Sequence, residues 1–190
     1  MLWGQDDTQK FRYAIRLAAA LSAIALYSRD RLMVARIRSS EVEEIHGPLL
    51  SELGLLPLLS NLEHWRASGT TDLNHALRRY ALHSHRPGLT LVISDLLSPR
   101  GYLDGMRQLL RRRHNVVLLH LLTPDEIEPS LQGDLRFIDI ETESALDISL
   151  DGGIRQLYRD RLDAWKGEIK SECHRRGSGY LFIRTDEPWD

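Results

Sequence analysis

Apolar residues recur every three or four positions over residues 10–27, and this spacing predicts a helix. Arg12 and Arg16 occupy a narrow polar stripe, so the helix is expected to be covered on most of its sides. Thr8 or Asp7 can cap its start. The same reasoning predicts further helices over residues 57–65, 72–83, 99–113 and 153–176.

Two near-continuous runs of leucine and β-branched residues, 89–94 and 115–122, are typical of strands buried on both faces of a parallel sheet. Because a helix is predicted between them, these strands are expected to be adjacent and parallel. Shorter strands are predicted over residues 31–37, 41–45 and 180–184, with a hairpin formed by residues 135–140 and 145–150. The alternation of strand and helix predicts one α/β domain with a mostly parallel sheet.

The composition changes this picture little. With 42% hydrophobic residues, 27% charged residues and a formal net charge of -2, the chain belongs with soluble globular proteins and gives no reason to expect a nucleic-acid partner. We expect a cytoplasmic protein, since no apolar stretch approaches a membrane span, the first residues lack a secretory pattern, and Cys173 is the single cysteine. Arg111, Arg112 and Arg113 form one basic run, interpreted as a helix end, with a phosphate-binding patch as the alternative.

Candidate chemistry lies where the strands end, because open α/β sheets bind ligands beyond the carboxyl ends of their strands. Asp95 ends the strand over 89–94, and Thr71 lies in the loop that opens the helix over 72–83. A hydroxyl and a carboxylate are hard oxygen ligands that suit Mg²⁺ or Mn²⁺. The structural alternative is that Thr71 or Thr70 caps its helix and that Asp95 caps the helix after it.

Other chemical groups carry weaker signals. His75, His83 and His85 offer no pair on one helix face at zinc-ligand spacing, so solvated histidines are expected. Cys173 and His174 are neighbours that point in different directions on a helix, which favours a buried structural thiol over a nucleophile and base. No glycine-rich phosphate loop occurs in the sequence.

Two segments resemble motifs of a known domain. Residues 69–73 (Gly-Thr-Thr-Asp-Leu) and 92–96 (Val-Ile-Ser-Asp-Leu) are similar to the second and third motifs of von Willebrand factor type A (vWA) domains. Residues 14–32, 133–136 and 179–188 resemble the bacterial domain-of-unknown-function family 58 (DUF58), and the similarity covers nearly the whole chain.

This resemblance implies a Rossmann-like vWA fold with a metal-ion-dependent adhesion site. Thr71 would be its hydroxyl ligand, Asp95 its carboxylate ligand, and Asp72 would order the loop. The family's first motif, Asp-x-Ser-x-Ser, does not occur in this sequence, so the first central strand is expected to be missing, through a late start or a natural loss. Mg²⁺ or Mn²⁺ is therefore expected to bind weakly, and more tightly in a chain extended upstream by such a motif.

The resemblance implies a protein-interaction module without enzymatic activity, with a MoxR-type AAA+ ATPase as its partner in assembling or maturing other complexes. One alternative is a Mg²⁺-dependent hydrolase or phosphoryl-transfer enzyme that uses Asp95. Another is a degenerate scaffold without a ligand. We expect the Thr71 and Asp95 side chains to lie close together at one sheet edge, both partly open to solvent, as the family resemblance requires.

Overall fold

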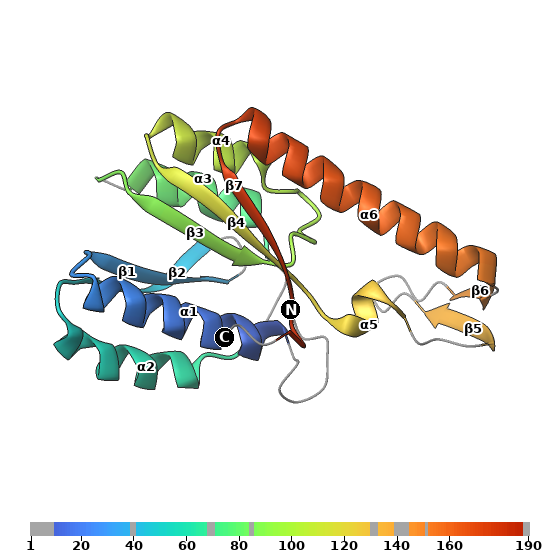
Figure 1. Cartoon of the computed structure of the whole chain (residues 1–190), viewed down its shortest axis with the longest axis horizontal. Coiled ribbons are helices and arrows are strands. Elements are labelled where there is room, and N and C mark those ends of the chain that lie inside the picture. Colours follow the sequence, from blue (N-terminus) through green and yellow to red (C-terminus); the bar gives the residue numbers. More distant parts are fainter. Residues whose placement is uncertain are drawn as a thin grey trace.

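The protein is built around a three-stranded parallel sheet with the strand order β3-β4-β7. The computed structural model describes residues 10–38, 41–67, 71–83, 86–129, 133–138, 145–150 and 152–187. In chain order its elements are α1 (Lys10–Tyr27), β1 (Leu32–Arg38), β2 (Glu41–Leu49), the 3-10 helix η2 (Glu52–Gly54), α2 (Leu55–His64), α3 (Leu73–His83), β3 (Leu89–Ser94), α4 (Leu103–Arg111), β4 (Asn115–Leu122), α5 (Pro124–Ile127), β5 (Gly133–Ile138), β6 (Ala145–Leu150), α6 (Gly152–Arg175) and β7 (Gly179–Arg184). Figure 1 shows the sheet with helices on both sides.

The central strand β4 fixes the register of the sheet. It pairs in parallel with β3 from Leu89↔Asn115 to Ser94↔His120, and with β7 from Val117↔Gly179 to Leu122↔Arg184. The prediction of adjacent, parallel strands joined across α4 is therefore confirmed, as is the mixed α/β class.

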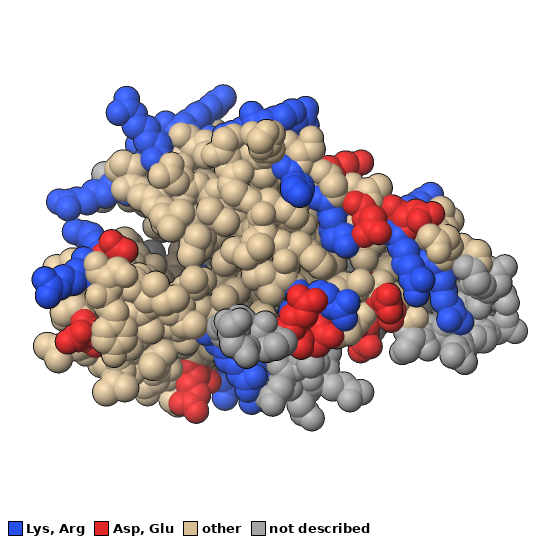
Figure 2. Space-filling view, in the orientation of Figure 1, with Lys and Arg blue, Asp and Glu red and all other residues tan. Residues whose placement is uncertain are grey.

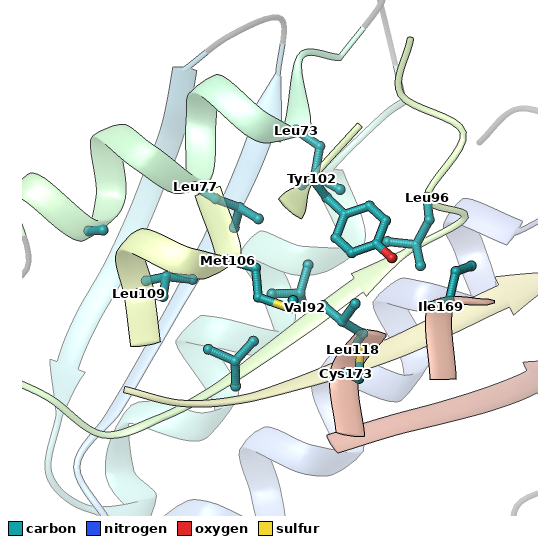
Figure 3. Close-up of a cluster of buried hydrophobic side chains, with 12 residues drawn as sticks. Leu73, Leu77, Val92, Leu96, Tyr102, Met106, Leu109, Leu118, Ile169 and Cys173 are labelled. Carbon is teal, nitrogen blue, oxygen red and sulfur yellow. The ribbon is translucent and has the colours of Figure 1, made fainter. Parts of the chain in front are cut away.

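Alternate residues of β4 point to opposite faces of the sheet, where two apolar clusters cover them. Val116 and Leu118 pack with side chains of α3, α4 and α6, including Met106 and Ile169 (Figure 3). Residues from the other face, among them Leu119, pack against α1. The near-continuous apolar run of β4 thus reflects burial on both faces.

Helix α1 is covered on two sides. Tyr13 and Leu17 pack on the sheet, while other residues of α1 pack against a cluster centred on Leu58 and Leu62 of α2. Arg12 and Arg16 are exposed as predicted, but so is Ile24, which the pattern assigned to the apolar face. The predicted caps Asp7 and Thr8 lie outside the described residues.

The β1–β2 ribbon corrects one predicted boundary. These strands pair antiparallel and form a sheet separate from β3, β4 and β7. The predicted strand over residues 41–45 ends before Gly47 and Pro48, whereas β2 continues through them to Leu49. In the pairing with β1, Gly47 and Pro48 lie between the pairs His46↔Val34 and Leu49↔Leu32, at an irregularity of the ladder where a proline without an N–H is tolerated.

Helix α4 is shorter than the predicted helix over residues 99–113. A turn precedes it, in which Gly101 N–H donates to the Ser98 carbonyl over 2.8 Å and Gly101 adopts a φ of 67°. This left-handed conformation, which glycine adopts without steric cost, is incompatible with a helix starting at Pro99. The predicted helix start is therefore wrong by about one turn.

The C-terminal part follows the predicted pattern. Strands β5 and β6 pair antiparallel, as a hairpin requires, although the predicted strand residues 139–140 lie outside the described residues. Helix α6 ends where Gly177 adopts a φ of 67° and Ser178 N–H donates to the Cys173 carbonyl. That arrangement is the glycine stop expected from the sequence.

A close approach of α3 and α4 generates a stability prediction. An added Cβ at Gly105 would lie 2.5 Å from the Cβ of Leu77 and 2.7 Å from the Asn74 carbonyl oxygen. We expect Gly105→Ala to lower the free energy of unfolding by about 2 kcal/mol, because overpacking forces the helices apart. The matched control is Gly167→Ala in α6, where an added Cβ would meet no atom of the described residues within 4 Å apart from its chain neighbours and helix backbone, and urea denaturation should show a gain of about 0.5–1 kcal/mol. Equal effects of both substitutions would contradict the packing argument.

Candidate functional site

Asp95 lies immediately beyond β3, at the carboxyl edge of the parallel sheet. Its Oδ2 accepts a hydrogen bond from Lys10 Nζ over 2.9 Å, and its Oδ1 accepts one from Leu97 N–H over 3.3 Å. Leu96, between them, is buried with a φ of 56°, a left-handed conformation that is strained in a residue other than glycine. Asp95 does not cap the next helix, because α4 begins only at Leu103.

Thr71 lies in the neighbouring loop, which is bonded to the segment after Asp95. The Ser98 hydroxyl donates to the Thr71 carbonyl over 2.9 Å and accepts from Leu73 N–H over 3.2 Å. Ser98 thereby joins the two loops that carry the predicted ligands. Whether the Thr71 hydroxyl and the Asp95 carboxylate meet across this junction stays a prediction.

Asp72 orders the first loop. Its Oδ1 accepts from His75 N–H over 2.9 Å at the start of α3, and its Oδ2 pairs with the Arg100 guanidinium over 3.2 Å. The alternative that Thr71 caps this helix is wrong, since Asp72 takes that role, and Thr70 lies outside the described residues.

A buried lysine, Lys10, also lies at this edge of the sheet. The sequence did not single it out as a site residue. Lys10, the first residue of α1, is only 2% exposed, and its Nζ lies 2.9 Å from Asp95 Oδ2 and 2.6 Å from Glu126 Oε1. The Asp95 and Glu126 side chains are 14% and 17% exposed. The Lys10 ammonium therefore pairs with two largely buried carboxylates, Asp95 just after β3 and Glu126 in α5 after β4.

Glu126 is held by a local motif that was present in the sequence. Its Oε2 accepts from both Thr123 N–H and the Thr123 hydroxyl, while Glu126 N–H donates to Thr123 Oγ1, which makes a capping box at the start of α5. A threonine followed three residues later by a glutamate is the sequence signature of this motif. The signature could have located Glu126, but not its lysine partner.

The charges at the edge are fixed by their surroundings. Burial raises the pKa of Asp95, but the hydrogen bond and positive charge of Lys10 outweigh it, so the pKa lies below its ordinary value. The carboxylate is therefore held ionised, as an acceptor for Lys10 and for the backbone of the loop. A carboxylate with a lowered pKa is a weak base, which suits a positioning role better than proton transfer.

His120 is buried on β4 near this edge. Its Nδ1 lies 2.9 Å from the Tyr180 hydroxyl, and its ring packs edge-on against Trp165 and Phe182. Its Nε2 has no hydrogen-bond partner among the described residues. Burial lowers the pKa of His120 to about 4, against the opposing effect of the Asp95 charge, so the ring is neutral near pH 7.

The remaining predicted groups lie apart from the edge. Cys173 is buried, which confirms the structural thiol, and His83 Nδ1 bonds the Arg79 carbonyl at the end of α3. Over the described ranges, no three histidine, cysteine, aspartate or glutamate side chains are grouped so that they could hold a metal ion. Within the same ranges, no helix is both long and apolar enough to cross a membrane.

The surface charge is distributed unevenly. In the view of Figure 2, lysine and arginine side chains gather along the upper edge, over α3 and α4 of Figure 1, while both signs are mixed toward the lower right. Arg111 lies in the last turn of α4 and Arg112 follows as its C-cap, which confirms the helix-end interpretation of the basic run. Their positive charges favour the negative end of the helix dipole.

Comparison with known proteins places this chain among bacterial relatives. Residues 1–166 match the model of the family described as protein of unknown function DUF58. The uncharacterized protein Rv1480 of Mycobacterium tuberculosis is 28% identical over 118 residues, which cover 62% of this chain and 37% of that protein. Protein MAV169 of Mycobacterium avium is 27% identical over 120 residues, which cover 62% of this chain and 69% of that protein. The matched segment thus spans little more than a third of the longer relative.

Two solved structures are similar to this chain. An aerotolerance-related membrane protein from Bacteroides fragilis, crystallised with multiple mutations to serine, matches with a TM-score of 0.56 at 16% identity, covering 98% of this chain and 86% of that chain. BatB from Bacteroides thetaiotaomicron matches with a TM-score of 0.47 at 13% identity, covering 92% of this chain and 80% of that chain. The first similarity supports the α/β fold and is consistent with the predicted vWA-like arrangement.

Burial of His120 generates a prediction for the pH dependence of stability. Between the ordinary pKa of 6.5 and the folded value of about 4, the unfolded chain binds a proton that the folded chain does not. Stability should therefore decrease as the pH falls through this window, by on the order of 3 kcal/mol in total. We expect His120→Gln, which cannot titrate, to flatten the dependence in urea denaturation series between pH 7 and pH 4. His174→Gln, at an exposed position of α6, is the control, and equal slopes in the His120 variant and the parent would refute the assignment.

Proposed function

Since the chain belongs to the DUF58 family, we propose that it is a vWA-like protein-interaction module that docks partner proteins at the carboxyl edge of its parallel sheet. The family match and the α/β fold support a module of this kind. Fold similarity alone does not define a function, so the argument rests on the chemistry of the edge.

The observation that carries the proposal is an exposed apolar side chain on a fixed loop. Leu97 is 56% exposed and follows directly after Asp95 and the buried Leu96. Its backbone N–H is bound by Asp95, and the next residue, Ser98, bonds to the loop before α3. A side chain presented on a pre-ordered loop loses little conformational entropy when it is buried by a partner.

The surroundings of Leu97 resemble the rim of an interface. The Arg100 guanidinium is largely exposed while it pairs with Asp72, and Thr71 lies in the loop that Ser98 bonds. An apolar anchor with a polar, charged rim is the usual organisation of protein interfaces, and arginine is enriched in them. These residues match the edge that the vWA resemblance assigns to partner binding.

The family resemblance makes a MoxR-type AAA+ ATPase the proposed partner, with a role in the assembly or maturation of other complexes. A cytoplasmic location is part of the same proposal. The alternative of a Mg²⁺-dependent enzyme that uses Asp95 gains no support from the edge, since Lys10 already binds that carboxylate.

The experiment measures binding of a purified MoxR-type ATPase from the same organism by biolayer interferometry. We expect Leu97→Ser to weaken binding at least about tenfold, because removal of a buried anchor from an interface typically costs more than 1 kcal/mol. The matched control is Leu89→Ser, at the start of β3 and thus at the other end of the sheet from the Leu97 loop, where the leucine is 66% exposed. Equal binding by the two variants, or no binding by the parent chain, would exclude this edge and this partner.

A further inference from the structure

Lys10 brings three parts of the chain together at the carboxyl edge. It begins α1, while its two carboxylate partners follow β3 and lie in α5, after β4. In Figure 1, the start of α1, the end of β3 and α5 lie toward the same end of the sheet. The lysine is almost completely buried, so its charge is neutralised by these partners and not by solvent.

The carboxylate oxygens at this position are all engaged. Asp95 Oδ2 accepts a hydrogen bond from Lys10 Nζ, and Asp95 Oδ1 accepts one from Leu97 N–H. Glu126 Oε1 accepts a hydrogen bond from Lys10 Nζ, and Glu126 Oε2 accepts one from Thr123 N–H. Each of the four oxygens thus accepts a hydrogen bond from the protein.

A divalent ion requires a different environment. Mg²⁺ takes six oxygen ligands in near-octahedral geometry and gives up its waters reluctantly. At this edge an ion would have to compete with a covalently tethered ammonium for Asp95 Oδ2, the carboxylate of the predicted metal site. The described residues therefore do not fit a resident metal ion next to Asp95.

We infer that the Lys10 ammonium is the resident cation of the carboxyl edge, and that it holds Asp95 and Glu126 together in place of a divalent metal. The edge is then ordered by a charge that the chain itself supplies. Metal chelation leaves this order unchanged. The inference is independent of the proposed docking, because it concerns what supports the loop and not what binds to it.

The test compares thermal melts of the full chain after EDTA treatment and with excess MgCl₂ or MnCl₂. The melting temperature of the parent protein is expected to be the same in all three solutions. Lys10→Met keeps most of the side-chain volume and leaves two buried carboxylates without a cation. We expect this variant to melt about 10 °C lower and to be restabilised by Mn²⁺. Lys170→Met, at an exposed position on α6, is the matched control and should behave like the parent.

Two results would overturn the inference. One is a parent protein whose melting temperature falls on chelation; the other is Mn²⁺ stabilising the parent as much as Lys10→Met. If Lys10→Met does not fold, the triple variant Lys10→Met, Asp95→Asn, Glu126→Gln is measured in its place, because it removes all three charges at nearly constant volume. A folded triple variant that is insensitive to metal supports charge neutralisation by Lys10, whereas a triple variant that also fails to fold refutes it.

Discussion

The parallel pairing of β4 with both β3 and β7 is the constraint on which the rest of the structure depends. Parallel neighbours cannot be joined by a tight turn, so the chain must cross back over the sheet between them, and α4 and α6 lie on these connections. Both helices pack on one face, while α1 covers the other. The same constraint directs the carboxyl ends of all three strands to one edge, which brings Asp95 and Thr123 to the same region although β4 and a helix separate them in sequence.

The charged groups at the carboxyl ends of β3 and β4 are largely closed to solvent, although Leu97 beside them is exposed. Asp95, Glu126 and Lys10 form a buried ionic cluster, and His120 lies beneath the edge as a neutral ring among aromatic side chains. Burial of two carboxylates and an ammonium costs desolvation free energy, which their mutual attraction and the hydrogen bonds to Thr123 and Leu97 offset. Removal of one member would leave buried charge without a partner, so the cluster also ties the loop after β3 to the start of α1 and to α5. The strained backbone of Leu96 indicates that the loop is held in a defined conformation.

The similarity to solved structures illustrates how little sequence the fold requires. At 16% identity, 98% of this chain still aligns in structure with the Bacteroides fragilis protein. The core of this fold needs apolar runs in the parallel strands and apolar inner faces on the helices, which many sequences can supply. The polar residues at the carboxyl edge are free to differ within that frame, so the chemistry of each protein must be argued from its own side chains. In this chain that chemistry combines an exposed Leu97 with a lysine-centred ionic cluster.

The sequence by itself determined the elements whose signals are local. The apolar runs of β3 and β4, the helical spacing of α1 and the glycine stop after α6 depend on neighbours within a few residues, and each predicted its element correctly. The parallel pairing followed from a general rule of chain connection. Only the tertiary structure decided that β2 passes through Pro48 at an irregularity of its ladder and that α4 starts after a glycine turn. The tertiary structure alone also showed that Lys10 pairs with Asp95 and Glu126, which are 85 and 116 residues away in sequence. The partner of a buried charge depends on the topology of the chain, and no periodic sequence pattern indicates it.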